Sequence, residues 1–167
     1  MNQRGNIFII LAIIATLAFG ATYYYNLSVS KQNTNFKTKE SFKTYSSQSM
    51  GINIDVNQKF TINDQSSRIL LSNTDGEVII SRAGTQFNDL DSYLKDFDLK
   101  NHTQILSEED LKIDSLHTKK RKVSIDGNLN ESYYKIFTGT RVYTLSTSSE
   151  ALYDDLDQIA KSFKYIP

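Results

Sequence analysis

The two histidines, His102 and His117, are the residues whose side chains most readily do acid–base or metal chemistry. No His-x-x-His or His-x-x-x-His pair is present, and the chain has no cysteine that could join them in a zinc site. No Gly-x-Ser-x-Gly motif, phosphate-binding loop or dinucleotide glycine fingerprint occurs either. We therefore predict no catalytic, cofactor-binding or metal-ligating residue. A hydrolase would have to assemble a dispersed site from a serine, His117 and an acid, and it stays an alternative.

The sequence contains one dense cluster of basic residues, the run Lys119, Lys120, Arg121 and Lys122. It could bind an anionic partner. On a strand, however, successive side chains point to opposite faces, so only half of the run could share one patch. An edge strand protected from pairing by lysines is the other interpretation. The aspartates of residues 89–98 and 154–157 lack the spacing of a calcium loop and are typical of solvated helix faces.

Composition limits the class of protein. The 167 residues contain 19 basic and 19 acidic side chains, no cysteine, no tryptophan and one proline. The absence of cysteine excludes a disulfide-stapled scaffold, and the zero net charge argues against a general nucleic-acid-binding protein. The charges are unevenly divided, because residues 1–49 carry a net +4 and residues 50–167 a net −4. The two ends of the chain therefore meet different surroundings.

Residues 7–25 form an apolar run with no charged side chain that ends in three tyrosines. As a helix, the run is nearly long enough to cross the ~30 Å hydrocarbon core, and tyrosines favour the headgroup level. We expect a single-pass transmembrane anchor after a short segment, residues 1–6. A signal peptide cleaved before Ala21 would instead give a secreted protein. A prepilin-like leader cut after Gly5 would give a minor-pilin-like structural subunit, although that class usually has Glu where Ile10 stands.

Residues 26–49 are rich in Ser, Thr, Asn, Gln and Lys and show no hydrophobic period. We expect a disordered polar stalk. Its lysines would favour a cytoplasmic location by the positive-inside rule, whereas a short N-terminus before a signal-like apolar run usually places the following domain outside the cytoplasm. We expect the outside location.

Residues 50–167 can fold into one domain. Alternation predicts strands over 51–56, 68–72, 77–81, 111–116, 120–125, 131–137 and 141–147, with a hairpin turn at Asp75-Gly76 and a loop through 107–110. Helical spacing of apolar residues predicts helices over 88–99, capped by Asn88, and from about 150 to 163. Thr147 and Glu150 have the spacing of a capping box. This order predicts an α+β domain in which two helices pack on a mostly antiparallel sheet.

The stretches 51–54, 122–127, 133–137, 141–145 and 159–164 resemble the PsbP-like superfamily. This fold is shared by the extrinsic protein of the oxygen-evolving complex and a Ran-binding nuclear import factor. The resemblance covers about residues 50–166. It implies an accessory or interaction domain, without implying photosynthesis or Ran binding, because one fold hosts many functions. Together with the anchor, it predicts a membrane-anchored extracytoplasmic binding or accessory domain without catalytic activity, whose partner is a protein or an envelope component.

Overall fold

The computed structural model describes residues 41–125, 127 and 129–167. The expected anchor at 7–25 and most of the expected stalk lie outside this part of the chain. Within it, no helix is long and apolar enough to cross a membrane. The described residues form one compact unit from Ser41 to Pro167.

Two antiparallel sheets form the domain. The smaller sheet has the order β1-β2-β10, with β1 (Phe42–Ser47), β2 (Ile52–Asn57) and β10 (Lys164–Tyr165). The larger, seven-stranded sheet has the order β3-β4-β5-β9-β8-β7-β6. Its strands are β3 (Thr61–Gln65), β4 (Arg68–Asn73), β5 (Gly76–Gly84), β6 (Thr103–Ile113), β7 (Leu116–Ile125), β8 (Leu129–Phe137) and β9 (Arg141–Thr147). The helices are α2 (Leu90–Lys100), the short 3₁₀ turn η1 (Glu150–Leu152) and α3 (Tyr153–Ser162).

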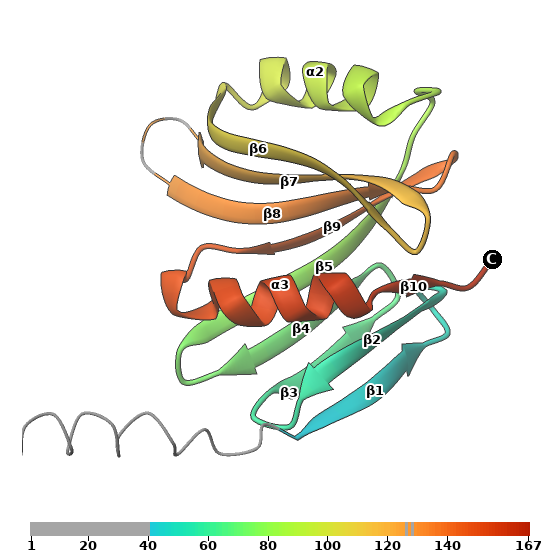
Figure 1. Cartoon of the computed structure of the whole chain (residues 1–167), viewed down its shortest axis with the longest axis vertical. Helices are drawn as coiled ribbons and strands as arrows, with labels where there is room; N and C mark the ends of the chain where they lie inside the picture. Colours follow the sequence, from blue (N-terminus) through green and yellow to red (C-terminus); the bar gives the residue numbers. More distant parts are fainter. Residues whose placement is uncertain (1–40, 126, 128) are drawn as a thin grey trace, which may run out of the picture. The chain divides into compact units, whose positions relative to one another are not determined.

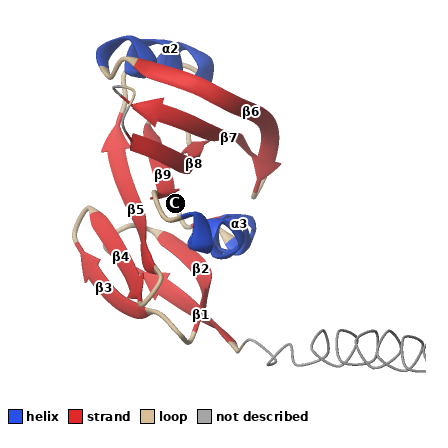
Figure 2. Ribbon diagram, turned by 90° about the vertical axis from the view of Figure 1, so that its left-hand side faces the viewer, coloured by secondary structure: helices blue, strands red, loops and turns tan. Residues whose placement is uncertain are grey.

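The seven-stranded sheet lies between α2 on one face and α3 with the small sheet on the other (Figures 1 and 2), and an apolar cluster fills each side. On one face, α3 and the small sheet enclose the main core, which includes Ile54, Leu71, Tyr143 and Phe163. On the opposite face, α2 covers β6, β7 and β8 and buries Leu90 and Leu94. The α+β class with a mostly antiparallel sheet and two packed helices is therefore confirmed, with the strands divided between two sheets.

Two elements follow directly from their apolar periods. In β2, Ile52, Ile54 and Val56 alternate with polar residues and are fully or almost fully buried, as period-two alternation requires. In α3 and its flanks, the predicted stripe of Leu152, Leu156, Ile159 and Phe163 is buried throughout. The predicted hairpin between β4 and β5 also forms, but its two turn residues are Thr74 and Asp75, because Gly76 already pairs with Asn73.

The domain begins earlier than predicted, because β1 lies inside the segment expected to be stalk. β1 pairs with β2 along its whole length, from Phe42 opposite Asn57 to Ser47 opposite Ile52. Only Phe42 and Tyr45 are large apolar residues in this strand, so its sequence shows almost no hydrophobic period. The backbone hydrogen bonds to β2, rather than burial of an apolar face, define the strand.

The predicted loop at 107–110 is wrong, because β6 continues through it, and the strand predicted over 111–116 ends at Ile113. The chain reverses at Asp114 and Ser115, both at positive φ, as a type I′ hairpin requires. In the β6–β7 pairing, the acidic residues of the expected loop face the basic run of β7. These cross-strand charge pairs explain why a polar segment forms a strand here.

The predicted helix caps are also corrected. Asp89, not Asn88, caps α2, because its carboxylate accepts a hydrogen bond of 2.7 Å from the Ser92 backbone N–H. The capping box of Thr147 and Glu150 does not form. The Thr147 hydroxyl instead donates to the Glu77 carbonyl, 2.7 Å away, and ties β9 to β5.

Candidate functional site

The basic run Lys119–Lys122 lies in β7, which is an interior strand between β6 and β8. The interpretation as a protected edge strand is therefore wrong, and β6 occupies the edge. As expected from strand geometry, the run is divided between two faces of the sheet. Lys119 and Arg121 point toward α2, whereas Lys120 and Lys122 contact residues of α3.

Lys119 and Arg121 are buried, and acidic side chains surround them. The Lys119 ammonium lies 2.6 Å from Asp110, 3.0 Å from Asp91 and 3.1 Å from Glu108. Burial alone would lower the pKa of Lys119, but hydrogen bonds to these three carboxylates raise it above its ordinary value. Arg121 binds both carboxylate oxygens of Asp98, at 2.8 and 3.0 Å, and also pairs with Glu108. The network joins α2 to β6 and β7, the last two strands at one edge of the seven-stranded sheet.

On the opposite face, Lys120 donates to Asp157 of α3 at 2.6 Å. The Tyr134 hydroxyl donates to the other oxygen of the same carboxylate at 2.7 Å. Burial and the Asp157 charge raise the pKa of Tyr134. The Lys122 ammonium lies 4.8 Å from the Tyr153 ring centre. Each cation of the run is thus held by a carboxylate or a ring of this same domain, and binding of an external anion by the run stays a prediction.

Lys135 of β8 is a buried cation without a carboxylate partner among the described residues. Its ammonium lies 3.9 Å from the Phe97 ring centre, 5.1 Å from that of Tyr133 and 5.8 Å from that of Tyr93. It also donates to the Thr144 hydroxyl at 3.1 Å. Burial lowers the pKa of Lys135 to about 8. Two of the three rings come from α2, so this aromatic box holds the helix on the sheet.

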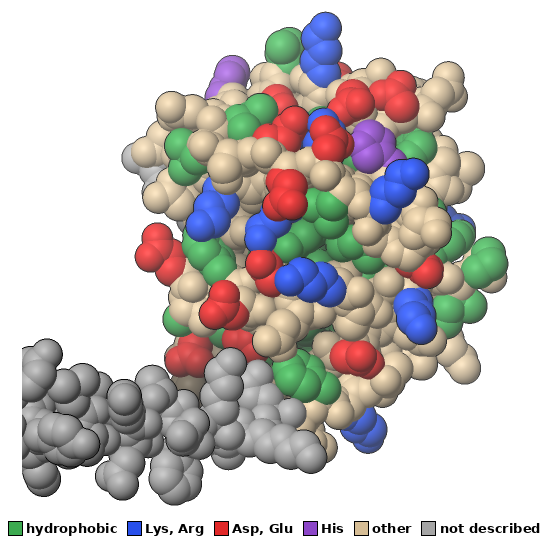
Figure 3. All heavy atoms as spheres, viewed as in Figure 1, with side chains coloured by type: hydrophobic (Ala, Val, Ile, Leu, Met, Phe, Trp, Pro, Cys, Tyr) green, Lys and Arg blue, Asp and Glu red, His purple; other side chains and the backbone are tan. Residues whose placement is uncertain are grey.

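The histidines lie apart. His102 is in the turn between α2 and β6 at a positive φ of 47°. His117 of β7 pairs with Asp110 of β6 at 2.9 Å, and both side chains are partly accessible to solvent. Among the described residues, neither histidine is hydrogen-bonded to a serine, and no group of three potential metal-ligating side chains is found. The face in Figure 3 carries interspersed acidic and basic side chains, without a field of one sign.

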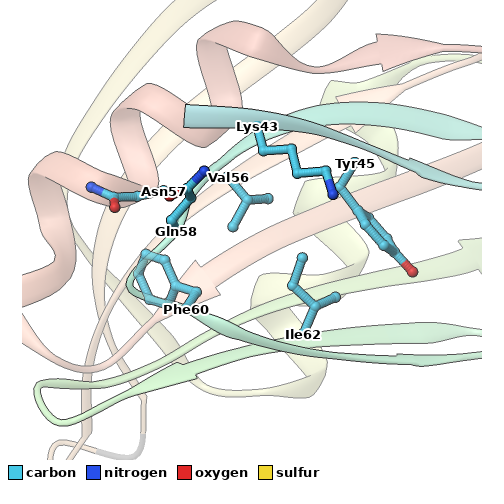
Figure 4. A pocket seen from close by; sticks show the side chains of 7 residues that line it. All are labelled: Lys43, Tyr45, Val56, Asn57, Gln58, Phe60 and Ile62. Atoms are coloured by element: carbon cyan, nitrogen blue, oxygen red, sulfur yellow. The ribbon is translucent and has the colours of Figure 1, made fainter. Parts of the chain in front are cut away.

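A groove opens between the edges of the two sheets. It is about 360 Å³ in volume and is lined by residues of β1, β2, β3 and the turn that joins β2 to β3. β1 is the edge of the small sheet and β3 the edge of the large one. The Tyr45 hydroxyl donates to Asp64 across this gap at 2.9 Å and joins the two edges. Figure 4 shows Val56, Phe60 and Ile62 pointing into the space, with Lys43 and Tyr45 along its mouth.

The charged side chains around the groove differ in whether they have a bonding partner in the domain. Lys59, beside Phe60, is bound to Asp155 of α3 at 2.8 Å. Both oxygens of Asp64 accept hydrogen bonds, from Tyr45 and from Ser49. Lys43 is exposed and makes no ion pair with a described residue. The groove thus combines an apolar floor with one unpaired cation at its mouth.

No protein-family model and no curated protein matches this chain. Solved structures do match. The cyanobacterial PsbP (CyanoP) of Synechocystis sp. PCC 6803 is 12% identical, with a TM-score of 0.53 over 78% of this chain and 96% of its own. The Saccharomyces cerevisiae Ran-binding protein Mog1p is 11% identical, with a TM-score of 0.54 over 77% of this chain and 97% of its own. The domain has the PsbP-like fold. At this identity, the likeness concerns the fold alone.

In this PsbP-like domain, the basic run that the sequence offers as a candidate site does not line the groove. The basic run supports the packing of both helices on the sheet. The groove includes Lys43 and Tyr45, which the sequence placed in the stalk, and its floor comes from β2, β3 and their turn. Sequence reasoning missed the groove because β1 had no strand period that could reveal it.

Proposed function

We propose that the chain is a single-pass membrane protein, anchored by residues 7–25, whose PsbP-like domain lies outside the cytoplasm and binds a protein or envelope partner without catalysis. The anchor and its orientation rest on the apolar run and the short N-terminus before it. The yeast protein of similar fold is a Ran-binding protein, which supports a protein-binding role for the fold here as well.

One structural observation carries the binding role. The charged side chains of β6, β7 and α2 are bound to one another and hold the fold together, whereas apolar side chains line a groove at the surface. Lys119 and Arg121 are occupied by four carboxylates, and His117 by one of them, Asp110. Val56, Phe60 and Ile62 instead line an open space. An accessible apolar concavity with few polar groups is typical of a binding site.

Site-specific photo-crosslinking in host cells tests this role. A photoreactive amino acid would replace one exposed residue at a time: Gln58 at the groove, Lys95 on α2 and Gln104 on β6. The proposal predicts a discrete, light-dependent adduct with one envelope or membrane protein from at least one of these positions. Full-length chain in the membrane fraction with no adduct from any position would contradict the binding role.

A further inference from the structure

The groove between β1 and β3 has the size and lining of a site for one large apolar side chain and its neighbours. Its volume of about 360 Å³ lies at the lower end of the ~300–1,000 Å³ typical of ligand sites. Val56 and Phe60 are 2% and 7% exposed, so their surfaces form a firm floor. Ile62 is half-buried and forms the wall on the side of β3.

Charge at the mouth favours an anionic occupant. Lys43 extends along the opening and makes no ion pair with a described residue (Figure 4). Lys59 already binds Asp155, and the Asp64 carboxylate accepts two hydroxyl hydrogen bonds. An incoming carboxylate beside the apolar group would therefore find Lys43 available.

The two borders of the groove favour an extended peptide over a lipid or a small molecule. β1 and β3 each lack a neighbouring strand on their outer side among the described residues. Unpaired backbone N–H and C=O groups on such an edge can pair with an added strand, as in β-augmentation. Side chains of an added strand alternate in direction, so every second one could point toward the groove.

We propose that this groove binds an extended segment of a partner protein in which Asp or Glu stands two residues away from an aromatic or aliphatic residue. The apolar side chain lies against Val56, Phe60 and Ile62, and the carboxylate two residues away, on the same side of the strand, pairs with Lys43. The inference deepens the proposed binding role and depends on it, because it names the site and the kind of segment that the partner offers.

Fluorescence anisotropy with three labelled peptides tests the inference. The probe is acetyl-Glu-Thr-Phe-Thr-Glu-amide carrying fluorescein, in which both Glu lie on the same side of an extended strand as Phe, and its controls replace both Glu by Lys, or Phe by Ser. The full chain is held in phosphatidylcholine nanodiscs, which avoids detergent in the groove. We expect the Glu-Thr-Phe-Thr-Glu peptide to bind, and each control peptide to bind at least about tenfold more weakly, because each lacks one of the two complementary features.

Two charge-reversal variants provide a matched comparison. Lys43→Glu should weaken binding of the Glu-Thr-Phe-Thr-Glu peptide about fivefold or more, since an exposed ion pair contributes up to about that factor and reversal adds repulsion. Lys112→Glu removes an exposed cation on β6, away from the groove lining, and should leave binding unchanged. Both side chains are exposed, so neither change disturbs the core. Ile62→Ser tests the wall of the groove, with circular dichroism verifying the fold.

Four results would overturn the inference: equal binding of all three peptides, equal effects of the two charge reversals, no binding at millimolar concentration, or binding of decanoate without binding of peptide. The purified chain reports on the groove whatever the membrane orientation in cells. A partner crosslinked through α2 or β6, with no peptide bound in the groove, would refute this inference and leave the proposed function standing.

Discussion

Replacing Lys135 by methionine should stabilise the domain at pH 7 and lose that advantage as the pH rises. Lys135 is 4% exposed and has no carboxylate partner among the described residues. Burial therefore disfavours its charged form, and three aromatic rings with the Thr144 hydroxyl offset only part of the cost. Methionine keeps an unbranched apolar side chain of similar length and removes the ammonium group.

The magnitude follows from the pKa. A fall in the pKa of Lys135 from 10.5 to about 8 corresponds to about 3 kcal/mol of preference for the neutral amine in the folded state. Cation–π attraction returns ~1–2 kcal/mol of this when the rings are desolvated. The variant should thus gain roughly 1–3 kcal/mol in unfolding free energy at pH 7.

The sign of the pH dependence follows from proton linkage. Between about pH 8 and 10 the unfolded chain keeps the Lys135 proton and the folded chain releases it, so the wild-type protein becomes relatively more stable as the pH rises. Lys135→Met has no such gain, and its advantage should therefore shrink toward zero near pH 10. The penalty is fully present below the folded-state pKa.

Urea unfolding of the full-length protein, followed by near-ultraviolet circular dichroism of its tyrosines at pH 7, 8, 9 and 10, measures this difference. Lys112→Met, at an exposed position, is the control and should change the unfolding free energy little at any pH. A Lys135→Met variant that is less stable than wild type at pH 7, or a difference that does not vary with pH, would refute the reasoning about the buried ammonium.

Two further matched pairs test the packing. Tyr134→Phe removes the hydroxyl that donates to Asp157 at 2.7 Å and should cost about 1.5–3 kcal/mol in thermal unfolding, whereas Tyr133→Phe should cost less, because the buried Tyr133 hydroxyl lies beside Arg121 without a well-formed hydrogen bond. Gly76→Ala should lower the melting temperature, since Gly76 has a φ of 135° and an added Cβ would lie 3.0 Å from the side chain of Ser149. Gly84→Ala should leave the melting temperature unchanged, because an added Cβ there meets no atom within 4 Å. Equal effects within either pair would contradict the structure.

Much of the fold could be predicted because local patterns and tertiary burial agree. β2 alternates, α3 carries an apolar stripe, and the hairpin predicted around Asp75-Gly76 forms between β4 and β5. β1 could not be predicted in this way, since its strand conformation depends on pairing with β2 and its own sequence is polar. The hydrophobic pattern of one segment cannot show a strand that forms only by pairing with another segment.

The same limit applies to the charged runs and to the groove. The sequence alone predicts a loop for the acidic run and a separate strand for the basic run. In the antiparallel register, each acid of Glu108-Glu109-Asp110 faces a base of Lys119-Lys120-Arg121. Two runs of opposite charge on either side of a turn at Asp114-Ser115 were a signal for this hairpin. The groove left no comparable signal, because it arises where the edges of two different sheets approach each other.

One labelling experiment tests whether the domain lies outside the cytoplasm. The native chain has no cysteine, so Ser66→Cys, in the exposed turn between β3 and β4, introduces a single thiol. Intact cells are treated with a membrane-impermeant maleimide, the membrane and soluble fractions are separated, and the labelled protein in each fraction is resolved by size. We expect labelled, full-length protein in the membrane fraction of intact cells. Labelling only after lysis would place the domain in the cytoplasm and contradict the proposed location.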